Sequence, residues 1–371
     1  MRPFILVAVL TASLAAQEAQ IAPALRTQIE TTVSKFMSAN HAPGISVAVV
    51  VHGAEVWSEG FGLADLENSV PATRYTLYRL ASISKPITAT AALMLWEQGK
   101  LDLDAPVQKY CPAFPQKEFP ISTRQVLGHL GGIRHYKSDS QDDAETGNTR
   151  HFDDPIKSGL DFFKNDPLVA KPGTRFNYST QGFTLVGCVI EGASGEKYVD
   201  YVNKHIFAPA GMTKALADDH YQIIPFRTRF YSRDKTGSVI NADFLDSSYK
   251  IPGGGWLSSA DDMAAFEAAM LNDRLLKHAT TLVMWTPQKL PDGTMSEYAL
   301  GWGTGKDLGV PDVGHGGGQQ GTSTFIMIAP EQRAGVVVLI NMDGGEASSL
   351  ATDLLSLVLK SEGVAVTNPK K

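Results

Sequence analysis

The sequence ASISKP, at positions 81–86, stands directly before a long apolar run at 87–101. On a helix, Ser82 and Lys85 would share one face, because residues three apart are neighbours there. A serine hydroxyl is a weak nucleophile at neutral pH unless a base takes its proton, and a neutral lysine amine can do this. The usual lysine pKa is about 10.4, so burial or a neighbouring cation must lower it. The stretch therefore predicts a helix that begins with a nucleophile and its base.

The S-x-x-K spacing alone is weak evidence, because it occurs at four places in the chain. These are Ser82/Lys85, Ser194/Lys197, Ser232/Lys235 and Ser247/Lys250. Only the first pair precedes a continuous helical pattern. The other three are followed by a glycine at a helix end, a polar turn and a glycine run. We expect these three pairs to lie on the surface.

The composition excludes several classes of protein. The chain has 371 residues, of which 43% are hydrophobic, which is enough for one large domain or two lobes. A net charge of −6 and the lack of a long basic block argue against a nucleic-acid partner. The nine histidines are scattered and no H-E-x-x-H motif occurs. We therefore expect no metal and no other cofactor.

The first 16 residues have the features of a secretory signal peptide. One positive charge precedes an apolar run at 3–10, and small residues follow up to Ala16. A disordered or packed N-terminus is the alternative. No later segment reaches the roughly 18 uninterrupted apolar residues that a membrane helix needs. We expect a cleaved signal at 1–16 and a periplasmic or secreted protein without an integral membrane segment.

The two cysteines lie in different kinds of sequence. Cys111 is in a polar segment before a proline, whereas Cys188 belongs to an apolar helical pattern. Export would permit a disulfide, but the sequence cannot show that two cysteines meet. We therefore expect two unlinked thiols.

The order of the predicted elements indicates the architecture. Helical patterns occupy residues 22–39, 87–101, 181–191, 198–207, 259–270 and 347–359, and β-rich segments occupy 44–61, 226–239, 298–302, 322–328 and 335–340. This order predicts an α+β fold, in which an antiparallel β-sheet is flanked by N- and C-terminal helices and carries an inserted all-helical lobe. We expect one domain at 22–371, made of an α/β lobe (22–121 and 222–371) and a helical lobe (122–221). A ligand site would lie between the lobes.

A serine–lysine hydrolase also needs a second proton carrier, and two tyrosines are candidates. Tyr201 begins a literal Y-x-N but lies inside an amphipathic helical pattern, where a tyrosine is usually packed. Tyr178 begins the sequence YST at 178–180, at a junction between a loop and a helix, where a side chain can face a cleft and still be held rigidly. We favour Tyr178, whose pKa a cationic lysine nearby would lower.

A strand must bind the substrate backbone, and two segments are candidates for it. KTG at 235–237 is a literal match, but its glycine is typical of the tip of a polar hairpin. HGGG at 315–318 precedes a β-rich segment, and its glycines would let a substrate approach the backbone closely. The sequence GGGQQG at 316–321 also fits G-x-G-x-x-G, but a strand pattern follows it rather than a helix, which argues against a dinucleotide site. We favour His315, Gly316, Gly317 and Gly318.

The three motifs SISK at 82–85, YST at 178–180 and HGG at 315–317 occur in this order and at wide spacing. In this respect the chain resembles the serine β-lactamase and penicillin-binding-protein superfamily, over about residues 24–360. The resemblance is greatest to the class C-like branch and its mitochondrial β-lactamase-like (LACTB-type) serine proteases. It implies a β-lactamase/transpeptidase-like fold.

The resemblance also implies a role for each residue of the site. Ser82 would be acylated, and Lys85 and Tyr178 would share the proton transfers. His315 would contact the substrate or the Lys–Tyr pair, and the backbone N–H groups of Ser82 and Gly318 would hold the oxyanion. Two residues depart from the pattern of true lactamases.

Thr180 stands where lactamases usually have an asparagine that contacts a substrate amide, and His315 replaces a lysine that binds a β-lactam carboxylate. Both changes suit an esterase or peptidase better than an antibiotic-degrading enzyme. We therefore expect an exported serine hydrolase that cleaves an ester or amide bond in a small molecule or peptide. The alternatives are a non-catalytic scaffold or binding protein, and a cell-wall D-alanyl-D-alanine carboxypeptidase. The substrate, the oligomeric state and the choice between Lys85 and Tyr178 as acylation base remain open.

Overall fold

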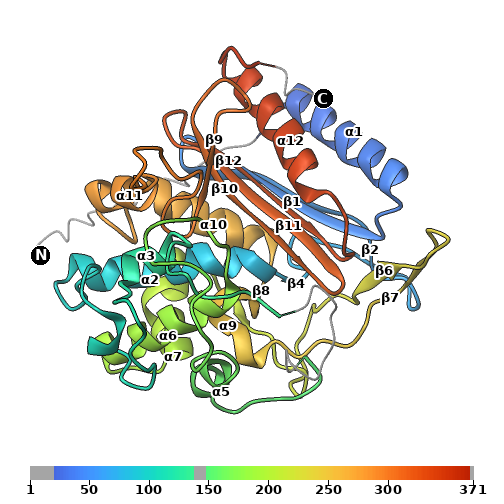
Figure 1. Ribbon diagram of the computed structural model, residues 1–371. Helices are drawn as coiled ribbons and strands as arrows, with labels where there is room; N and C mark the ends of the chain where they lie inside the picture. The colour runs from blue at the N-terminus through green and yellow to red at the C-terminus, as the bar shows by residue number, and fades with distance from the viewer. Residues whose placement is uncertain (1–20, 138–147, 368–371) are drawn as a thin grey trace, which may run out of the picture.

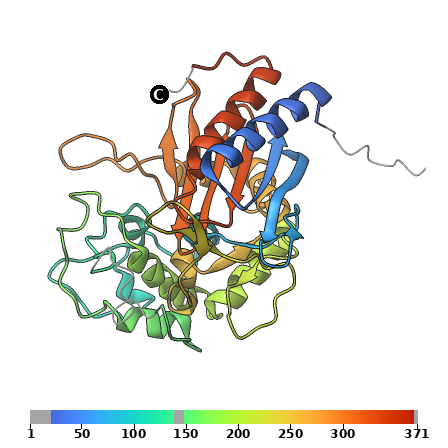
Figure 2. The same cartoon turned by 90° about the vertical axis from the view of Figure 1, so that its right-hand side faces the viewer.

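The computed structural model describes residues 21–137 and 148–367. The predicted signal peptide at 1–16 lies outside these residues. The first described helix, α1 (Pro23–Asn40), lies beside the last, α12 (Ala347–Ser361), and Figures 1 and 2 show the two helices together on one face of a β-sheet. Within the described residues, no helix is both long enough and apolar enough to cross a membrane.

The central sheet has seven antiparallel strands in the order β3-β2-β1-β12-β11-β10-β9. Their bounds are β1 Gly44–Val51, β2 Ala54–Asp65, β3 Val70–Pro71, β9 Gly303–Gly305, β10 Asp312–Gln319, β11 Thr322–Ala329 and β12 Ala334–Ile340. The pairing of β1 with β12 joins residues near the two ends of the chain, with Ile45 opposite Ile340. The first and last strand segments are therefore neighbours at the centre of the sheet.

Each face of the sheet covers its own hydrophobic core. Successive side chains of a strand point to opposite faces. On β1, Val47 and Val49 therefore pack under α1 and α12, while Ala48 and Val50 belong to the core on the other face. That second core includes α10 (Ala260–Leu271), which contacts β1, β2 and β12. Because both faces of β1 are buried, the strand is apolar at nearly every position.

The remaining helices gather below the sheet around α2 (Ser84–Glu97), which is buried along almost its whole length (Figure 1). They are α3 Thr123–Leu127, α5 Pro155–Asp161, α6 Thr180–Ser194, α7 Tyr198–Val202, α8 Ala208–Ala210, α9 Ile251–Gly254 and α11 His278–Met284. Three short strands, β4 Tyr78–Arg79, β8 Trp256–Ser258 and β5 Leu216–Ala217, form a second sheet. The predicted fold class is confirmed, and the exact lobe boundaries stay a prediction.

Two predicted strands differ from the structure. The hairpin expected at 226–239 pairs β6 (Tyr231–Arg233) with β7 (Val239–Asn241), and its tip holds the KTG sequence at 235–237. Residues 298–302 form no regular strand, because Gly301 adopts a φ of +81° and turns the chain. Strand β9 begins only after this turn, at Gly303. The turn brings Tyr298 back toward the centre of the molecule.

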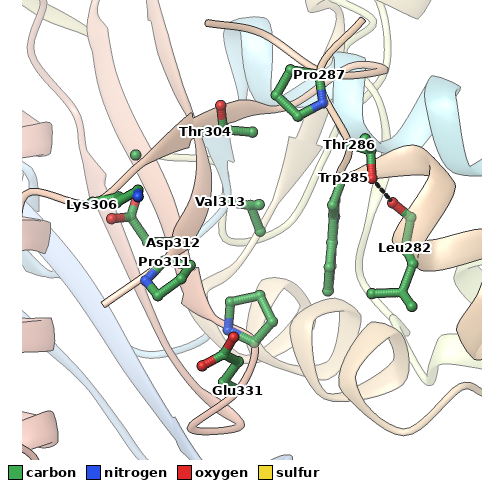
Figure 3. A pocket seen from close by; sticks show the side chains of 12 residues that line it. Leu282, Trp285, Thr286, Pro287, Thr304, Lys306, Pro311, Asp312, Val313 and Glu331 are labelled. Atoms are coloured by element: carbon green, nitrogen blue, oxygen red, sulfur yellow. Dashed lines mark hydrogen bonds between the residues drawn. The ribbon is translucent and has the colours of Figure 1, made fainter. Parts of the chain in front are cut away.

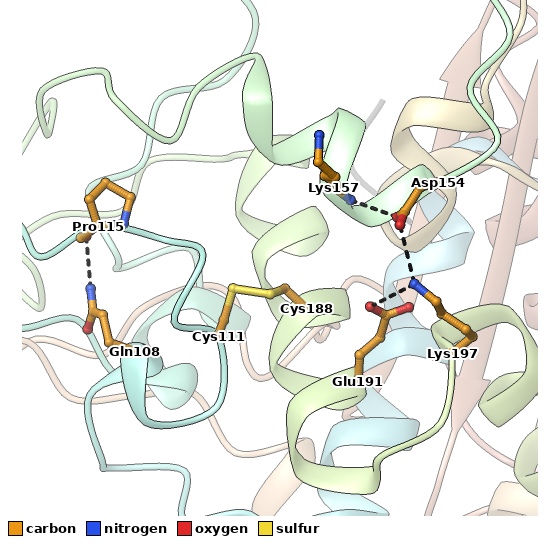
Figure 4. Close-up of a disulfide and its surroundings, with 8 residues drawn as sticks. All are labelled: Gln108, Cys111, Pro115, Asp154, Lys157, Cys188, Glu191 and Lys197. Carbon is orange, nitrogen blue, oxygen red and sulfur yellow. Dashed lines mark hydrogen bonds and ion pairs between the residues drawn. A yellow bond between two sulfur atoms is a disulfide. The ribbon is translucent and has the colours of Figure 1, made fainter.

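The expectation of two unlinked thiols is wrong. Cys111 and Cys188 form a disulfide, with their Cα atoms 5.5 Å apart (Figure 4). Cys111 is fully buried because its loop lies directly against α6. This loop lies so close to α6 that a side chain at Gly192 of the helix would overlap the backbone oxygen of Tyr110 in the loop. A contact between residues 77 apart depends on this packing, which the local sequence does not reveal.

Replacing Cys188 with serine should lower the free energy of unfolding by about 2–5 kcal/mol, because the disulfide restricts a long loop in the unfolded chain. Thermal melts of wild type and Cys188→Ser, each with and without a reductant, test this. The reductant should lower the melting temperature of wild type and leave that of the variant unchanged. A wild type whose melting temperature ignores the reductant, and which shows two free thiols, would contradict the disulfide.

Candidate active site

Ser82 lies in a short 3-10 turn, Ala81–Ile83, that leads directly into α2. Ala81 adopts a φ of +48°, in the left-handed region that alanine rarely occupies. Two strands hold the residue before it, because the Leu80 N–H donates to the Trp256 carbonyl and its own carbonyl accepts from Thr324. Contacts on both sides therefore fix a strained turn and the position of the serine.

The glycines of β10 allow that strand to lie against the serine turn. A Cβ atom added to Gly317 would lie 2.2 Å from the Leu80 carbonyl oxygen, which no real structure tolerates. A Cβ atom on Gly318 would meet nothing within 4 Å, because this residue faces open space. Gly317 is therefore required for the close packing of β10 against the serine turn, whereas a side chain at Gly318 would meet no neighbour.

Lys85 is fully buried and its amine contacts three oxygen atoms. Nζ lies 2.8 Å from Ser82 Oγ, 2.8 Å from the Gly253 carbonyl oxygen and 3.2 Å from Thr180 Oγ1. Within the described chain, this amine forms no ion pair with a carboxylate. Burial, and to a smaller extent the charge of Lys250, hold the pKa of Lys85 well below its usual value. The neutral amine is therefore favoured, and its lone pair can accept the Ser82 proton while its N–H groups donate to Gly253 and Thr180.

Tyr178 stands next to this pair, at the start of α6. Its hydroxyl is hydrogen-bonded to Ser82, and Lys85 Nζ lies 4.8 Å from the centre of its ring. Ser179 caps the helix by accepting from the Gly182 N–H at 2.9 Å, which fixes the chain immediately after the tyrosine. Tyr201, the rejected alternative, is buried in α7 against His205.

The expected lowering of the Tyr178 pKa is wrong. Burial raises the pKa of this phenol well above its usual value, and its hydrogen bond with Ser82 opposes the shift only in part. The expectation assumed a cationic lysine nearby, but Lys85 favours its neutral form. Tyr178 therefore keeps its proton and can donate a hydrogen bond to Ser82 Oγ.

Thr180, the first residue of α6, faces the lysine. Its hydroxyl lies 3.2 Å from Lys85 Nζ and is also hydrogen-bonded to Tyr136, whose pKa burial raises to about 12. The Thr180 N–H donates to His135 Nδ1 at 3.2 Å. The hydroxyl is thus engaged with the buried base and a neighbouring phenol.

His315 lies on β10 and is also buried. Burial is the main cause that lowers the pKa of His315 to about 3, and any charge on Lys85 would act in the same direction, so the ring is neutral. Its Nδ1 lies 2.6 Å from the Gly316 carbonyl oxygen and its Nε2 lies 2.8 Å from the Tyr298 hydroxyl. Because a carbonyl only accepts, Nδ1 carries the proton and Nε2 accepts from the phenol. His315 therefore supplies no fixed positive charge.

Sequence reasoning missed two aromatic residues of the site. Tyr298, which orients His315, was assigned to a strand. His129 is fully buried, with its ring 4.3 Å from that of Tyr178 and 4.7 Å from that of Tyr298. Its Nδ1 accepts from the Ser179 N–H at 3.1 Å, and burial holds its pKa well below the usual value. The cluster of histidines and a tyrosine at 129–136 was the available signal for His129.

The expectation that Ser247 and Lys250 lie on the surface is also wrong. Both are buried, because Ser247 directly precedes the short turn Ser248–Lys250, which leads into α9 behind the site. Lys250 Nζ lies 5.6 Å from the centre of the Tyr136 ring. Burial and the charge of Arg79 lower the pKa of Lys250 to about 7, although Asp218 and Asp246 oppose the shift. Lys250 is thus a second buried amine that disfavours a charge on Lys85.

Two hollows lie apart from the serine. One, of about 450 Å³, lies at the start of β10 between the loop after α11 and the turn after β11, and Trp285, Asp312 and Glu331 are among its lining residues (Figure 3). Burial raises the pKa of Asp312 to about 6. The other, of about 540 Å³, lies between the glycines of β10 and the start of α12. Neither is lined by Ser82, Lys85 or Tyr178.

The antiparallel sheet with its flanking helices, and the buried Ser82–Lys85 pair between them, are typical of serine β-lactamase-like proteins. Comparison with known proteins supports the same class. The model of the family described as Beta-lactamase matches residues 29–359, and the chain belongs to this family. The predicted superfamily is thus confirmed, and its class C-like detail stays a prediction.

Named relatives share much of the chain. It is 36% identical to human "Serine beta-lactamase-like protein LACTB, mitochondrial", over 78% of this chain and 69% of that one. It is 27% identical to "Protein flp" of Staphylococcus aureus, over 88% of this chain and 65% of that one. An octameric penicillin-binding protein homologue from Pyrococcus abyssi superimposes with a TM-score of 0.80 at 29% identity, over 93% of this chain and 78% of that one.

Replacing Gly317 with alanine should destabilise the protein by about 1–3 kcal/mol, because the new methyl group overlaps the Leu80 carbonyl and must displace the serine turn. Gly318→Ala is the matched control for stability, since its methyl group has open space. Thermal melts of both variants test this. Equal melting temperatures for the two variants would contradict the packing of β10 against the turn.

Proposed function

We propose that the protein is a serine hydrolase that cleaves an ester or amide bond through an acyl-enzyme on Ser82. The observation that carries this proposal is the 2.8 Å separation of Ser82 Oγ from the buried Lys85 Nζ. A lysine with a depressed pKa is the kind of base that activates a serine. Membership of the Beta-lactamase family supports the same reaction class.

In the proposed acylation, Ser82 Oγ attacks the substrate carbonyl while the neutral Lys85 amine takes its proton. Tyr178, which keeps its proton, donates it to the leaving oxygen or nitrogen and regains a proton from the Lys85 ammonium. The backbone N–H groups of Ser82 and Gly318 would stabilise the negative oxygen of the intermediate. Water then releases the acid by the reverse sequence of proton transfers. This assigns Lys85 as the acylation base.

The state of His315 favours substrates without an anionic group at that position. Its ring is neutral, and both nitrogens are engaged with Gly316 and Tyr298. A β-lactam carboxylate would therefore meet no fixed cation there. Thr180 likewise directs its hydroxyl to Lys85. These features support an ester or peptide substrate.

We also propose that the protein is exported and works in the periplasm or outside the cell. The N-terminal sequence at 1–16 supports this. The Cys111–Cys188 disulfide adds independent support, because disulfides persist in oxidising compartments. The two proposed lobes, at 122–221 and in the rest of the domain, would meet around Ser82.

A fluorophosphonate probe tests the nucleophile, because it labels a serine only where a base activates it. Wild type should be labelled once, and Ser82→Ala should not be labelled. Lys85→Ala should label about 10²–10⁴-fold more slowly, the usual cost of losing a general base. Lys197→Ala is the matched control, since it removes an exposed lysine of another S-x-x-K pair.

Equal labelling of wild type and Ser82→Ala would contradict the nucleophile. No labelling of a folded wild type would instead favour a non-catalytic scaffold. A panel of acyl esters, peptides, a chromogenic β-lactam and muropeptides then separates an esterase or peptidase from a cell-wall D-alanyl-D-alanine carboxypeptidase.

The pH profile of kcat/KM on a nitrophenyl ester tests the link between the two buried lysines. Activity requires neutral Lys85, so it should fall as the pH drops through the depressed pKa of this residue. Lys250→Met removes a neighbouring cation, which raises the pKa of Lys85. The fall in kcat/KM on the acid side of the profile should therefore begin at higher pH in this variant. Lys197→Met should leave this acid limb of the profile in place. An unchanged limb, or a move to lower pH, would contradict the coupling.

A further inference from the structure

Two histidines and an aspartate from distant parts of the chain meet outside the serine site. His151 precedes α5, whereas Asp219 and His220 follow β5. One ligand atom from each side chain lies within 4.8 Å of the others. All three residues are partly exposed, so an ion could reach them from solvent.

A fourth residue, Asp246, orients both imidazole rings. Its side chain is 1% exposed, and its Oδ2 lies 3.0 Å from His151 Nδ1 and 2.5 Å from His220 Nδ1. Its Oδ1 accepts from the Ser248 N–H at 2.7 Å. A carboxylate at Nδ1 selects the tautomer whose proton is on Nδ1 and whose lone pair is on Nε2. Both rings are thus held in the form that binds metal ions.

The other polar contacts of the cluster leave these lone pairs available. His151 Nε2 lies 4.0 Å from an Asp153 oxygen, which is too long for a hydrogen bond. The Asp219 oxygens accept from the Tyr221 N–H and the Gln222 amide. A carboxylate oxygen can accept more than one bond, so these contacts do not preclude a metal ligand.

We propose that His151, Asp219 and His220 bind one divalent transition-metal ion, of which zinc is the best fit, with Asp246 as the outer-sphere carboxylate. Two imidazoles and one carboxylate are a common ligand set for zinc, with a water molecule in the fourth position. Ligands around tetrahedral zinc are about 3.4 Å apart, given bonds of about 2.1 Å. The ligand atoms, which now lie within 4.8 Å of one another, must therefore approach by up to about 1.4 Å, which the partly exposed side chains allow.

The ion and its outer-sphere carboxylate would link three segments of chain behind the serine site: the one before α5, the one after β5 and the one that contains Asp246. Asp246 precedes the turn that carries Lys250 and then α9, where Gly253 accepts a hydrogen bond from Lys85. A metal ion that links these segments would stabilise the folded state, by an amount that grows with the logarithm of its concentration relative to Kd. This proposal does not depend on whether Ser82 is a nucleophile.

The test is zinc binding to the full chain, prepared without a histidine tag and freed of metal with a chelator. Isothermal titration calorimetry should give one zinc ion per chain, and zinc should raise the melting temperature by a few degrees. Cobalt should bind in its place and give the intense visible absorption of a tetrahedral site. Asp246→Asn should weaken binding about 10–100-fold, the usual effect of losing an outer-sphere partner.

His151→Ala and His220→Ala should each weaken zinc binding by at least as much. The matched control is His205→Ala, because His205 pairs with Glu196 at 2.9 Å and, among the residues that the structure describes, belongs to no cluster of possible metal ligands. This control should bind zinc as wild type does. Wild type that binds no zinc, or a His220→Ala variant that binds it equally well, would overturn the proposal. The wild-type titration decides the matter even if a variant fails to fold.

Discussion

The site depends on the burial of one amine, that of Lys85, without a carboxylate partner in the described chain. Charging this amine would require an ammonium ion in a region that water does not reach. Lys250, a second buried amine, adds to that cost. The same burial keeps the proton on Tyr178 and leaves His315 neutral. The proposed base, acid and substrate strand thus share one physical cause, which is desolvation between the sheet and the helices.

The fold produces this burial by packing segments from distant parts of the chain around α2. The serine turn is strained at Ala81 and held between β8 and β11, and it fits against β10 only because Gly317 has no side chain. The wall behind Lys85 is formed by α9, next to the segment where Asp246 orients His151 and His220. A zinc ion there would reinforce the wall without touching the reacting atoms.

Much of this arrangement could be predicted from the sequence. The order of the helical and β-rich segments predicted the fold class, and the motifs carried by Ser82, Tyr178 and His315 indicated the superfamily. What could not be predicted depends on tertiary packing. Nothing local distinguishes the buried Lys250 from the exposed Lys197, or shows that Cys111 reaches Cys188. The direction of the Tyr178 pKa shift was wrong because it assumed a charged lysine, and burial decides that charge.

The protonation state of Lys85 is best measured directly, by NMR titration of the lysine side chains in protein labelled at the ε-carbon. Lys85→Met assigns its signal. The account predicts that this signal titrates far below the usual lysine pKa of about 10.4, while the exposed lysines titrate near that value. A Lys85 signal that titrates together with the exposed lysines would contradict the account, because the amine would then be charged at neutral pH and could not accept the Ser82 proton.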